Sequence, residues 1–476
     1  MKRSILFKVV LVPILVILFA FGTNASGQTV PTNFVYLPII NREVTPSVFG
    51  AEISVGNPKA ADIWSLAQAD GFYWVRKNGL LWSAVQPNNK SEWNWLNVSK
   101  LETELALSGR SGNKTILVVR STPLWAQKYP GHFCGPMKPE NIADFADFMK
   151  ETVKRYSASP YFIRYYELWN EPDVDHLGFP FDSMFGCWGE SSDPYFGGGY
   201  YAQMLSQVYP AIKSVNPEAQ VLIGGLLLDC DPTDLSSLTG CTTPASKVPP
   251  KFFEGILINN GGLYFDIANF HGYPARQDNT AVNPIVAEKT FSSWSARGGV
   301  VKGKIDFLRE VMAKYGISKP IFQSETALMR VASYPNLAVF ERYKADYLVW
   351  VFSRNMAENL LGTTWYTFDG PGWNYSGILD ANQAPLPAYQ AMKFAVSKLG
   401  GTVYLAPVST YTGIEGFKFR SGAKQVWVLF PSGNTIPAAI TLPAGYGAVY
   451  NTLGDPITPV NNTVTVDHPV YIEVSP

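Results

Sequence analysis

Short apolar segments alternate with longer amphipathic segments from about residue 48 to residue 400. The short segments predict buried β-strands and the longer ones predict helices. The predicted strands are Val48–Ile53, Tyr73–Arg76, Thr115–Arg120, Ile163–Trp169, Val221–Gly225, Phe265–Phe270, Pro320–Gln323 and Gly362–Phe368. The clearest helical patterns cover Ile142–Arg155, Tyr200–Val215, Gly303–Tyr315, Leu337–Asn359 and Ala388–Leu399.

Eight strands, each followed by a helical stretch, predict an α/β fold of the (β/α)₈ TIM barrel type over residues 48–400. A doubly wound open sheet is the competing α/β fold. That fold more often has a glycine-rich phosphate-binding turn after its first strand, and Phe49–Glu52 (FGAE) is not such a turn. The barrel is therefore favoured.

The pattern changes after Gly400, where helical periodicity gives way to short alternating runs. These runs are Gly416–Phe419, Val426–Phe430, Ala438–Leu442 and Val470–Val474. Turn residues separate them, which is typical of antiparallel strands. Residues 401–476 are predicted to form a small C-terminal antiparallel β domain that resembles a sandwich.

The composition agrees with a folded protein that has a large core. Hydrophobic residues make up 46% of the 476 residues and charged residues 16%, which argues against global disorder. Lysine plus arginine equals aspartate plus glutamate, at 38 each. The zero net charge gives no electrostatic reason to expect binding to nucleic acid or to an anionic membrane.

The N-terminus has the features of a secretory signal peptide. Lys2, Arg3 and Lys8 precede or begin an apolar run, Val9–Phe21, and the small residues of Thr23–Ala25 follow. Residues 1–25 are therefore predicted to be a signal peptide, residues 26–47 a linker, and the mature protein to be secreted. An uncleaved anchor that holds the protein at the cell surface is the alternative, although the run is short for a bilayer span.

Four cysteines fit an exported protein with disulfides. Cys134, Cys187, Cys230 and Cys241 allow three pairings. We favour Cys230–Cys241, which would close a short loop, together with Cys134–Cys187, which would tie two loops. A metal site is the rival, but no paired CxxC motif or nearby histidine supports it.

Two predicted strands end in glutamate. The run YYELWNEPD places Asn170 and Glu171 at the end of the fourth strand, and KPIFQSE places Glu325 at the end of the seventh. The C-terminal ends of barrel strands meet at one face, so both carboxylates are expected in one pocket. Such a pair is the machinery that breaks a glycosidic bond. Glu167 and Glu171, with Trp169 between them, share strand parity, so all three are expected to point the same way, with Glu167 deeper.

These motifs resemble those of the clan A glycoside hydrolases, which are retaining (β/α)₈ enzymes, and the similarity is nearest to families 39 and 5. The resemblance covers about Val48 to Leu399 and the C-terminal β domain. It implies that Glu171 is the acid/base and Glu325 the nucleophile. It also implies that Asn170 binds the sugar 2-hydroxyl and that Arg76, at the end of the second strand, supports the nucleophile.

The same resemblance implies four further residues at the substrate. His271 and Tyr273, after the sixth strand, would contact the sugar or orient the nucleophile. Trp365, on the eighth strand, would form the aromatic floor of the first subsite. Trp125, in the TPLWA turn after the third strand, would line the cleft or pack that turn. Gln86 stands where the clan usually has glutamate, at a position that is normally structural.

The sequence thus predicts a secreted retaining glycosidase that acts on a carbohydrate. No metal or organic cofactor is expected. Two other functions stay open: a carbohydrate-binding protein on a degenerate barrel, and a transglycosidase that transfers the sugar to another sugar. The sequence does not distinguish between xylan, mannan, glucan and arabinose-containing glycans.

Overall fold

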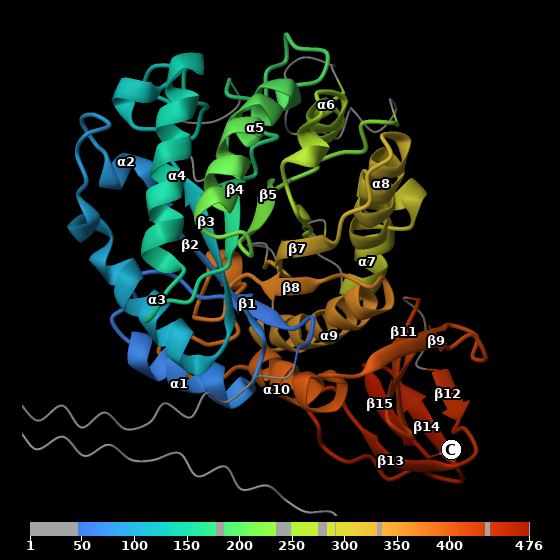
Figure 1. Cartoon of the computed structure of the whole chain (residues 1–476). Helices are drawn as coiled ribbons and strands as arrows, with labels where there is room; N and C mark the ends of the chain where they lie inside the picture. Colours follow the sequence, from blue (N-terminus) through green and yellow to red (C-terminus); the bar gives the residue numbers. More distant parts are fainter. Residues whose placement is uncertain are drawn as a thin grey trace, which may run out of the picture. The chain divides into compact units, whose positions relative to one another are not determined.

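Eight parallel strands form one sheet in the order β5-β4-β3-β2-β1-β8-β7-β6 in this computed structural model, which describes residues 46–177, 185–234, 249–274, 283–290, 292–330, 336–433 and 438–475. Parallel bridges between β5 and β6, at Leu222–Ile267 and Leu226–Phe270, join the two ends of the sheet. The strands are β1 (Gly50–Glu52), β2 (Trp74–Leu81), β3 (Lys114–Arg120), β4 (Tyr165–Asn170), β5 (Gln220–Gly225), β6 (Ala268–His271), β7 (Ile321–Thr326) and β8 (Gly362–Trp365). The predicted TIM barrel is confirmed, with all eight strands near their predicted positions (Figure 1).

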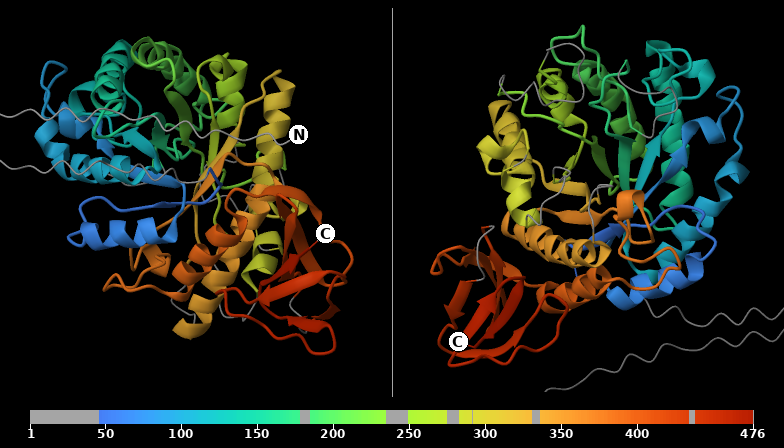
Figure 2. Two further views of the ribbon diagram at one scale, coloured as in Figure 1. Left: turned by 60° about the horizontal axis from the view of Figure 1, so that its bottom comes forward. Right: turned by 180° about the vertical axis from the view of Figure 1, so that it is seen from behind.

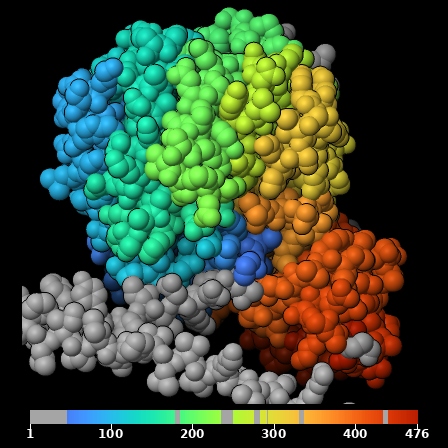
Figure 3. Space-filling view, in the orientation of Figure 1, coloured from blue at the N-terminus to red at the C-terminus, as the bar shows by residue number. Residues whose placement is uncertain are grey.

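Helices surround the strands, as two further orientations show (Figure 2). They are α1 (Ala60–Asp70), α2 (Trp82–Val85), α3 (Ser99–Ser111), α4 (Ile142–Tyr156), α5 (Gly198–Val215), α6 (Phe252–Ile258), α7 (Pro284–Thr290), α8 (Val300–Lys314), α9 (Leu337–Ala357) and α10 (Pro387–Leu399). In the space-filling view, atoms coloured from teal to gold make up most of the visible face of residues 46–400 (Figure 3).

The interior of the barrel is divided into an apolar end and a charged end. Five buried apolar side chains fill the end where the strands begin: Trp74, Ile116, Leu222, Ile267 and Phe322. Two residues further along β2, Arg76 is fully buried, and the charged residues at the C-terminal ends of the strands surround it. The apolar layer closes the barrel below, so the polar site can open only toward the C-terminal ends of the strands.

Helix α9 is buried on most of its circumference because two layers pack on it. It lies against the barrel and also against strands β9 (Val403–Pro407) and β10 (Ile414–Ser421) of the C-terminal region. Its first turn is capped by Asn336, whose side chain accepts from the backbone N–H groups of Ala338 and Val339. Arg354 of α9 forms an ion pair with Glu415 of β10. A helix between two layers must be apolar on more than one face, which explains its long apolar runs.

The C-terminal region consists of antiparallel sheets, as predicted. Within the described residues a five-stranded sheet has the order β13-β15-β11-β10-β9, and β12 pairs with β14. The remaining strands are β11 (Lys424–Pro431), β12 (Ala438–Thr441), β13 (Tyr446–Tyr450), β14 (Thr463–Val466) and β15 (Val470–Val474). The predictions for β10, β11, β12 and β15 are confirmed. Strands β9, β13 and β14 were not predicted, because their alternation is short and broken by turn residues.

The remaining predictions concern the N-terminal segment, the disulfides and membrane-spanning helices. The predicted signal peptide and nearly all of the linker lie outside the described residues, and so does Cys241. The predicted Cys134–Cys187 disulfide is confirmed, with a Cα–Cα distance of 5.2 Å. Among the described helices, none combines the length and the apolar character that crossing a bilayer requires.

Candidate active site

Arg76 organises the charged end of the barrel. A guanidinium has five N–H donors, and all five are used here. Its Nε and Nη2 donate to the two oxygens of Glu167, at 3.0 and 2.7 Å, and Nη2 also donates to Asn170 Oδ1, at 2.7 Å. Its Nη1 donates to Glu52 Oε2 and to Glu325 Oε1. One cation therefore fixes three carboxylates and an amide that come from β1, β4 and β7.

Glu171, His271 and Glu325 form a second group beside this cation. Nδ1 of His271 lies 2.7 Å from Glu171 Oε1 and 3.3 Å from Glu325 Oε2. One ligand atom from each of the three residues lies within 4.8 Å of the others. The two glutamates predicted from the strand ends therefore face each other across a gap of sugar-atom size.

The pKa directions separate the roles of the two acids. Burial raises the pKa of Glu171 well above its usual range, and the charge of Glu325 raises it further. Burial also raises the pKa of Glu325, but the charge of Arg76 and a hydrogen bond from Tyr273 lower it. Tyr273 Oη donates to Glu325 Oε2 at 2.5 Å. The surroundings of Glu171 thus favour its protonated form, whereas Arg76 and Tyr273 favour the carboxylate form of Glu325.

His271 is neutral and positions both acids. Burial and the charges of Arg76 and Lys304 lower its pKa well below the usual range. A neutral imidazole donates from one nitrogen and accepts at the other. Nδ1 lies 2.7 Å from Glu171 Oε1 and Nε2 lies 3.1 Å from Ser324 Oγ, so each ring nitrogen has a hydrogen-bonding partner. His271 is fully buried, so it holds the acids but presents no surface to a sugar.

The ring of His271 fits only because β5 ends in glycine. A Cβ atom at Gly225 would lie 2.1 Å from His271 Nε2 and 2.7 Å from Ser324 Oγ. We expect Gly225→Ala to push the ring away from Glu171, to lower kcat about 10- to 100-fold, and to destabilise the fold by about 1–3 kcal/mol. Steady-state kinetics and thermal melting measure the two effects. The matched control is Gly225→Ala combined with His271→Ala, which removes the clash and is expected to restore part of the lost stability. An unchanged kcat in the single variant would contradict the positioning role.

The end of β4 departs from regular strand geometry. Trp169 and Glu171 have φ angles of 77° and 48°, in the left-handed region that non-glycine residues rarely adopt. Trp169 consequently points out of the barrel, where its ring packs on Trp188 and its Nε1 donates to Cys134 O at 2.7 Å. The prediction that Trp169 points the same way as Glu167 is therefore wrong. The Cys134–Cys187 disulfide braces the segment on which Trp169 rests and thereby supports the turn that carries Glu171.

Trp365 does not form a floor for the sugar, so that prediction is wrong. Its ring is fully buried, Nε1 donates to Ser376 O at 2.9 Å, and it packs near Tyr347 of α9. No aromatic face is left for stacking. The following residue, Tyr366, is half-buried, and its ring lies 6.5 Å from that of Tyr273. The aromatic residue beside Tyr273 is therefore Tyr366, one residue after the predicted Trp365.

Trp125 packs the turn after β3. Its Nε1 donates to Gln86 O at 2.9 Å, and its ring meets the edge of Trp82 with centroids 5.4 Å apart. The side chain of Gln86 joins Trp82 to Lys90 O, which agrees with a structural role for this position. Part of Trp125 stays exposed, so the structure leaves its contact with substrate as a prediction.

Three polar residues of the site were not singled out from the sequence. Glu52 ends β1, and the strand-end rule that identified Glu325 could have found it. Ser324 lies between His271 and Glu167. Strand parity would place Ser324 on the opposite face of the sheet from its neighbour Glu325, so the sequence did not indicate it. Lys304 comes from α8 and donates to the backbone oxygens of His271 and Leu227. Nothing in its local sequence indicates this position.

Glu171, His271 and Glu325 also form a donor set that a divalent metal could use. Each of these groups already has a protein partner. His271 bonds Glu171 and Ser324, and Glu325 accepts from Arg76 and Tyr273. A carboxyl pair at this spacing is sufficient for glycoside chemistry without a metal.

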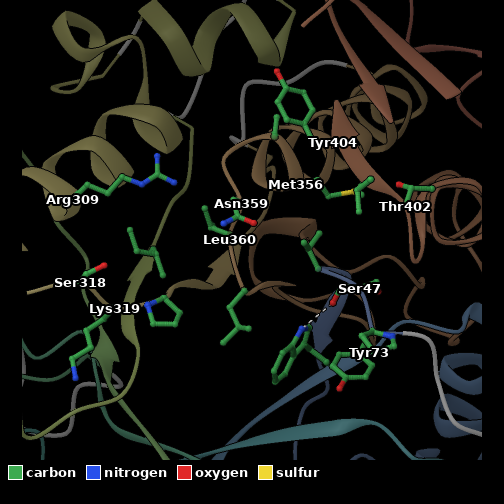
Figure 4. Close-up of a pocket in the computed structure, with 18 of the residues that line it drawn as sticks. Ser47, Tyr73, Arg309, Ser318, Lys319, Met356, Asn359, Leu360, Thr402 and Tyr404 are labelled. Atoms are coloured by element: carbon green, nitrogen blue, oxygen red, sulfur yellow. Dashed lines mark hydrogen bonds between the residues drawn. The ribbon is translucent and has the colours of Figure 1, made fainter. Parts of the chain in front are cut away.

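A large hollow lies at the opposite end of the barrel, with a volume of about 1260 Å³. Its walls include Tyr73, Tyr404, Arg309 and Lys319, and Trp74 Nε1 donates there to Ser47 O at 3.0 Å (Figure 4). Its lining contains no aspartate, glutamate, histidine or cysteine. Because its described lining offers no pair of carboxyl groups, glycoside chemistry is assigned to the C-terminal ends of the strands.

Comparison with known families agrees with this geometry. The model of the family described as cellulase (glycosyl hydrolase family 5) matches residues 38–355. A search of curated proteins found no match. The matched range contains Arg76, Asn170, Glu171, His271 and Glu325, so the residues placed together by the fold all lie inside it.

Solved structures share the fold at low identity. A family 39 glycoside hydrolase from the gut symbiont Bacteroides cellulosilyticus WH2 has a TM-score of 0.66 at 17% identity, over 90% of this chain and 81% of that chain. The family 30 subfamily 8 xylanase Xyn30A from Clostridium acetobutylicum has a TM-score of 0.57 at 12% identity, over 91% and 97%. The family 51 α-L-arabinofuranosidase AbfB from Bifidobacterium longum has a TM-score of 0.59 at 12% identity, over 91% and 96%. These similarities extend through the C-terminal sheets.

Proposed function

The chain belongs to glycosyl hydrolase family 5, and from this premise we propose that it is a secreted retaining glycosidase that cleaves its substrate through a covalent glycosyl-enzyme. The observation that carries the proposal is the approach of the two acids, with one carboxyl oxygen of Glu171 and one of Glu325 within 4.8 Å. Retaining enzymes place these groups about 5–5.5 Å apart, whereas inverting enzymes leave about 6.5–9.5 Å for a water molecule.

The first step uses the proton on Glu171 and the charge on Glu325. The Glu325 carboxylate forms a bond to the anomeric carbon while the bond to the leaving oxygen breaks, and Glu171 gives that oxygen its proton. In the second step Glu171, now a carboxylate, takes a proton from water. The water oxygen bonds to the anomeric carbon and the Glu325 carboxylate is released.

Arg76 and Tyr273 serve this cycle by stabilising Glu325 as a carboxylate. They also stabilise it as the leaving group of the second step. Asn170 is held by Arg76 through Oδ1, which turns its NH₂ group to the side from which the sugar 2-hydroxyl can accept. Nδ1 of His271 lies 2.7 Å from Glu171 Oε1, and this contact fixes the position of the carboxyl group that gives its proton to the leaving oxygen.

A panel of aryl glycosides and polysaccharides tests the activity, with and without a chelator. The panel includes xylan, mannan, glucan and arabinose-containing glycans, since solved relatives are described as a xylanase, a glucosidase and an arabinofuranosidase. NMR then reads the anomer that forms first. We expect the configuration of the substrate to be retained; an inverted first product would rule out the covalent route.

Secretion is supported by the sequence of residues 1–25 and by the Cys134–Cys187 disulfide, since disulfides persist in oxidising compartments. One solved relative of similar fold is described as a conserved exported protein from Bacteroides fragilis. Mass spectrometry of the expressed protein tests this part, because a chain that keeps all its N-terminal residues and stays in the cells would contradict it.

A further inference from the structure

Glu52 is a further acid of the site that the two-step reaction does not use. It is the last residue of β1, and its Oε2 accepts from Arg76 Nη1. The same nitrogen donates to Glu325, the proposed nucleophile. Glu52 therefore lies beside Glu325 rather than at a distant wall of the barrel.

Glu52 reaches the open part of the site. Its side chain is 8% exposed, equal to that of Glu325, whereas the side chains of Arg76 and Glu167 are fully buried. Within the ranges that the structure describes, its second oxygen, Oε1, makes no hydrogen bond. An acceptor is thus available beside the nucleophile.

Arg120 provides donors on the same side. It ends β3, and its Nε donates to Asn78 Oδ1 at 2.8 Å. Its two Nη groups form no hydrogen bond with any described residue. Arg120 is less buried than Arg76, and Asn78 follows Arg76 by two residues on β2, so this pair lies one step nearer the mouth of the barrel.

Electrostatic neighbours agree that Glu52 and Arg120 both lie near Arg76 and Glu325. Burial raises the pKa of Glu52 to about 7, and the charges that affect it most are then Arg76, Glu325 and Glu167. Burial lowers the pKa of Arg120, and the next strongest influences come from Arg76, Glu52 and Glu325.

The acid that serves the leaving group has different neighbours. After burial, the charges that most affect the pKa of Glu171 are Glu325, Asp173, Arg76 and Lys304. Glu52 shares the Nη1 group of Arg76 with Glu325, whereas Glu171 pairs with His271, so we assign Glu52 and Arg120 to the half of the site that holds the glycone, the sugar that Glu325 attacks.

We propose that Glu52 and Arg120 bind two adjacent hydroxyl groups of the glycone, other than the 2-hydroxyl assigned to Asn170. This inference rests on the proposed glycosidase function. A sugar hydroxyl both donates and accepts, so one can donate to Glu52 Oε1 while its neighbour accepts from Arg120. The substrate class follows: the glycone in this subsite carries two free, adjacent hydroxyls, and decoration at either one prevents binding.

The test measures kcat/KM with the 4-nitrophenyl glycoside that the wild type hydrolyses best and with its 3-, 4- and, where present, 6-deoxy analogues. Glu52→Ala is expected to lower kcat/KM about 10- to 100-fold on the parent glycoside. On one deoxy analogue the wild type and the variant are expected to differ by less than about 3-fold, because the contact is already absent. Arg120→Met is expected to show the same selectivity for the neighbouring hydroxyl.

The ratio of kcat/KM between wild type and variant is compared across substrates. A shifted pKa of Glu325 would change this ratio equally for every analogue, so only a lost contact with one hydroxyl makes it differ between them. The matched control is Glu104→Gln, which removes another buried carboxylate that is paired with a cation, Lys77, outside the site. It is expected to leave every ratio unchanged. An equal loss on all analogues with Glu52→Ala would overturn the proposal.

A wild type that turns over no glycoside would overturn the hydrolytic function instead. In that case calorimetric titration with the same glycosides tests the contact separately. Equal affinity of the wild type and of Glu52→Ala for every glycoside would overturn the role of Glu52, and weaker binding by the variant only to glycosides that keep the contacted hydroxyl would support it.

Discussion

Replacing Glu325 with glutamine is expected to lower kcat by about 10⁴-fold or more on every substrate, because an amide cannot form the bond to the anomeric carbon that the carboxylate forms. The fold is expected to persist. Arg76 faces three carboxylates, so a neutral side chain at position 325 reduces the excess of negative charge around one cation. Kinetics and thermal melting of the variant test both parts.

Azide shows whether the loss is that of a nucleophile. With Glu325→Ala, azide can enter the vacated space and attack the anomeric carbon while Glu171 protonates the leaving oxygen. The expected product is a glycosyl azide of inverted configuration. Residual activity near that of the wild type in Glu325→Gln, or no effect of azide on Glu325→Ala, would contradict the assignment.

The fold and the proximity of Glu171 and Glu325 could be predicted because they depend on long patterns. Buried parallel strands are apolar over four to eight residues and recur with helices between them, so modest errors at their ends do not change the count. The rule that barrel strands carry function at their C-terminal ends then placed Glu171, Glu325, Arg76 and His271 at one face. Their contacts with one another agree with this rule.

The orientation of individual side chains could not be predicted, because the strands are irregular where the site begins. Register shifts occur between Phe270 and His271 and between Gln323 and Thr326. Ser324 and Glu325, adjacent in sequence, both reach the site, which an ideal strand would not allow. Positive φ at Trp169 has a similar effect on β4. The alternation of side chains between the two faces of a strand therefore fails at the strand ends that carry the site residues.

The failure at Trp365 has the same origin. The residue was selected for its type and its strand, and both were right, but its ring faces α9 and Tyr366 faces the site. Packing between β8 and α9 decides which of two neighbouring aromatic residues turns inward. That packing involves residues about 20 positions earlier in the chain, such as Tyr347, and no local pattern reports it.

Glu171→Ala is expected to have an effect that depends on the leaving group. A substrate whose leaving group needs a proton is expected to lose about 10³-fold in kcat/KM, whereas a 2,4-dinitrophenyl glycoside is expected to lose less than about 10-fold, because its leaving group departs without protonation. The second step still lacks its base, so the activated substrate should give a burst followed by slow turnover. Steady-state and rapid-mixing kinetics measure both phases.

The pH profile and azide assign the proton to the same residue. In the wild type, kcat/KM falls at low pH as Glu325 is protonated and falls at high pH as Glu171, whose pKa is raised by burial, loses its proton. Glu171→Ala is expected to lose the fall at high pH and keep the one at low pH.

Azide needs no base, so it should restore turnover of the activated glycoside and give a product of retained configuration. Opposite configurations from the two variants require attack on opposite faces of the sugar, which only two acids on opposite sides of the anomeric carbon can produce; the same configuration from both would mean that one of the two roles is wrongly assigned.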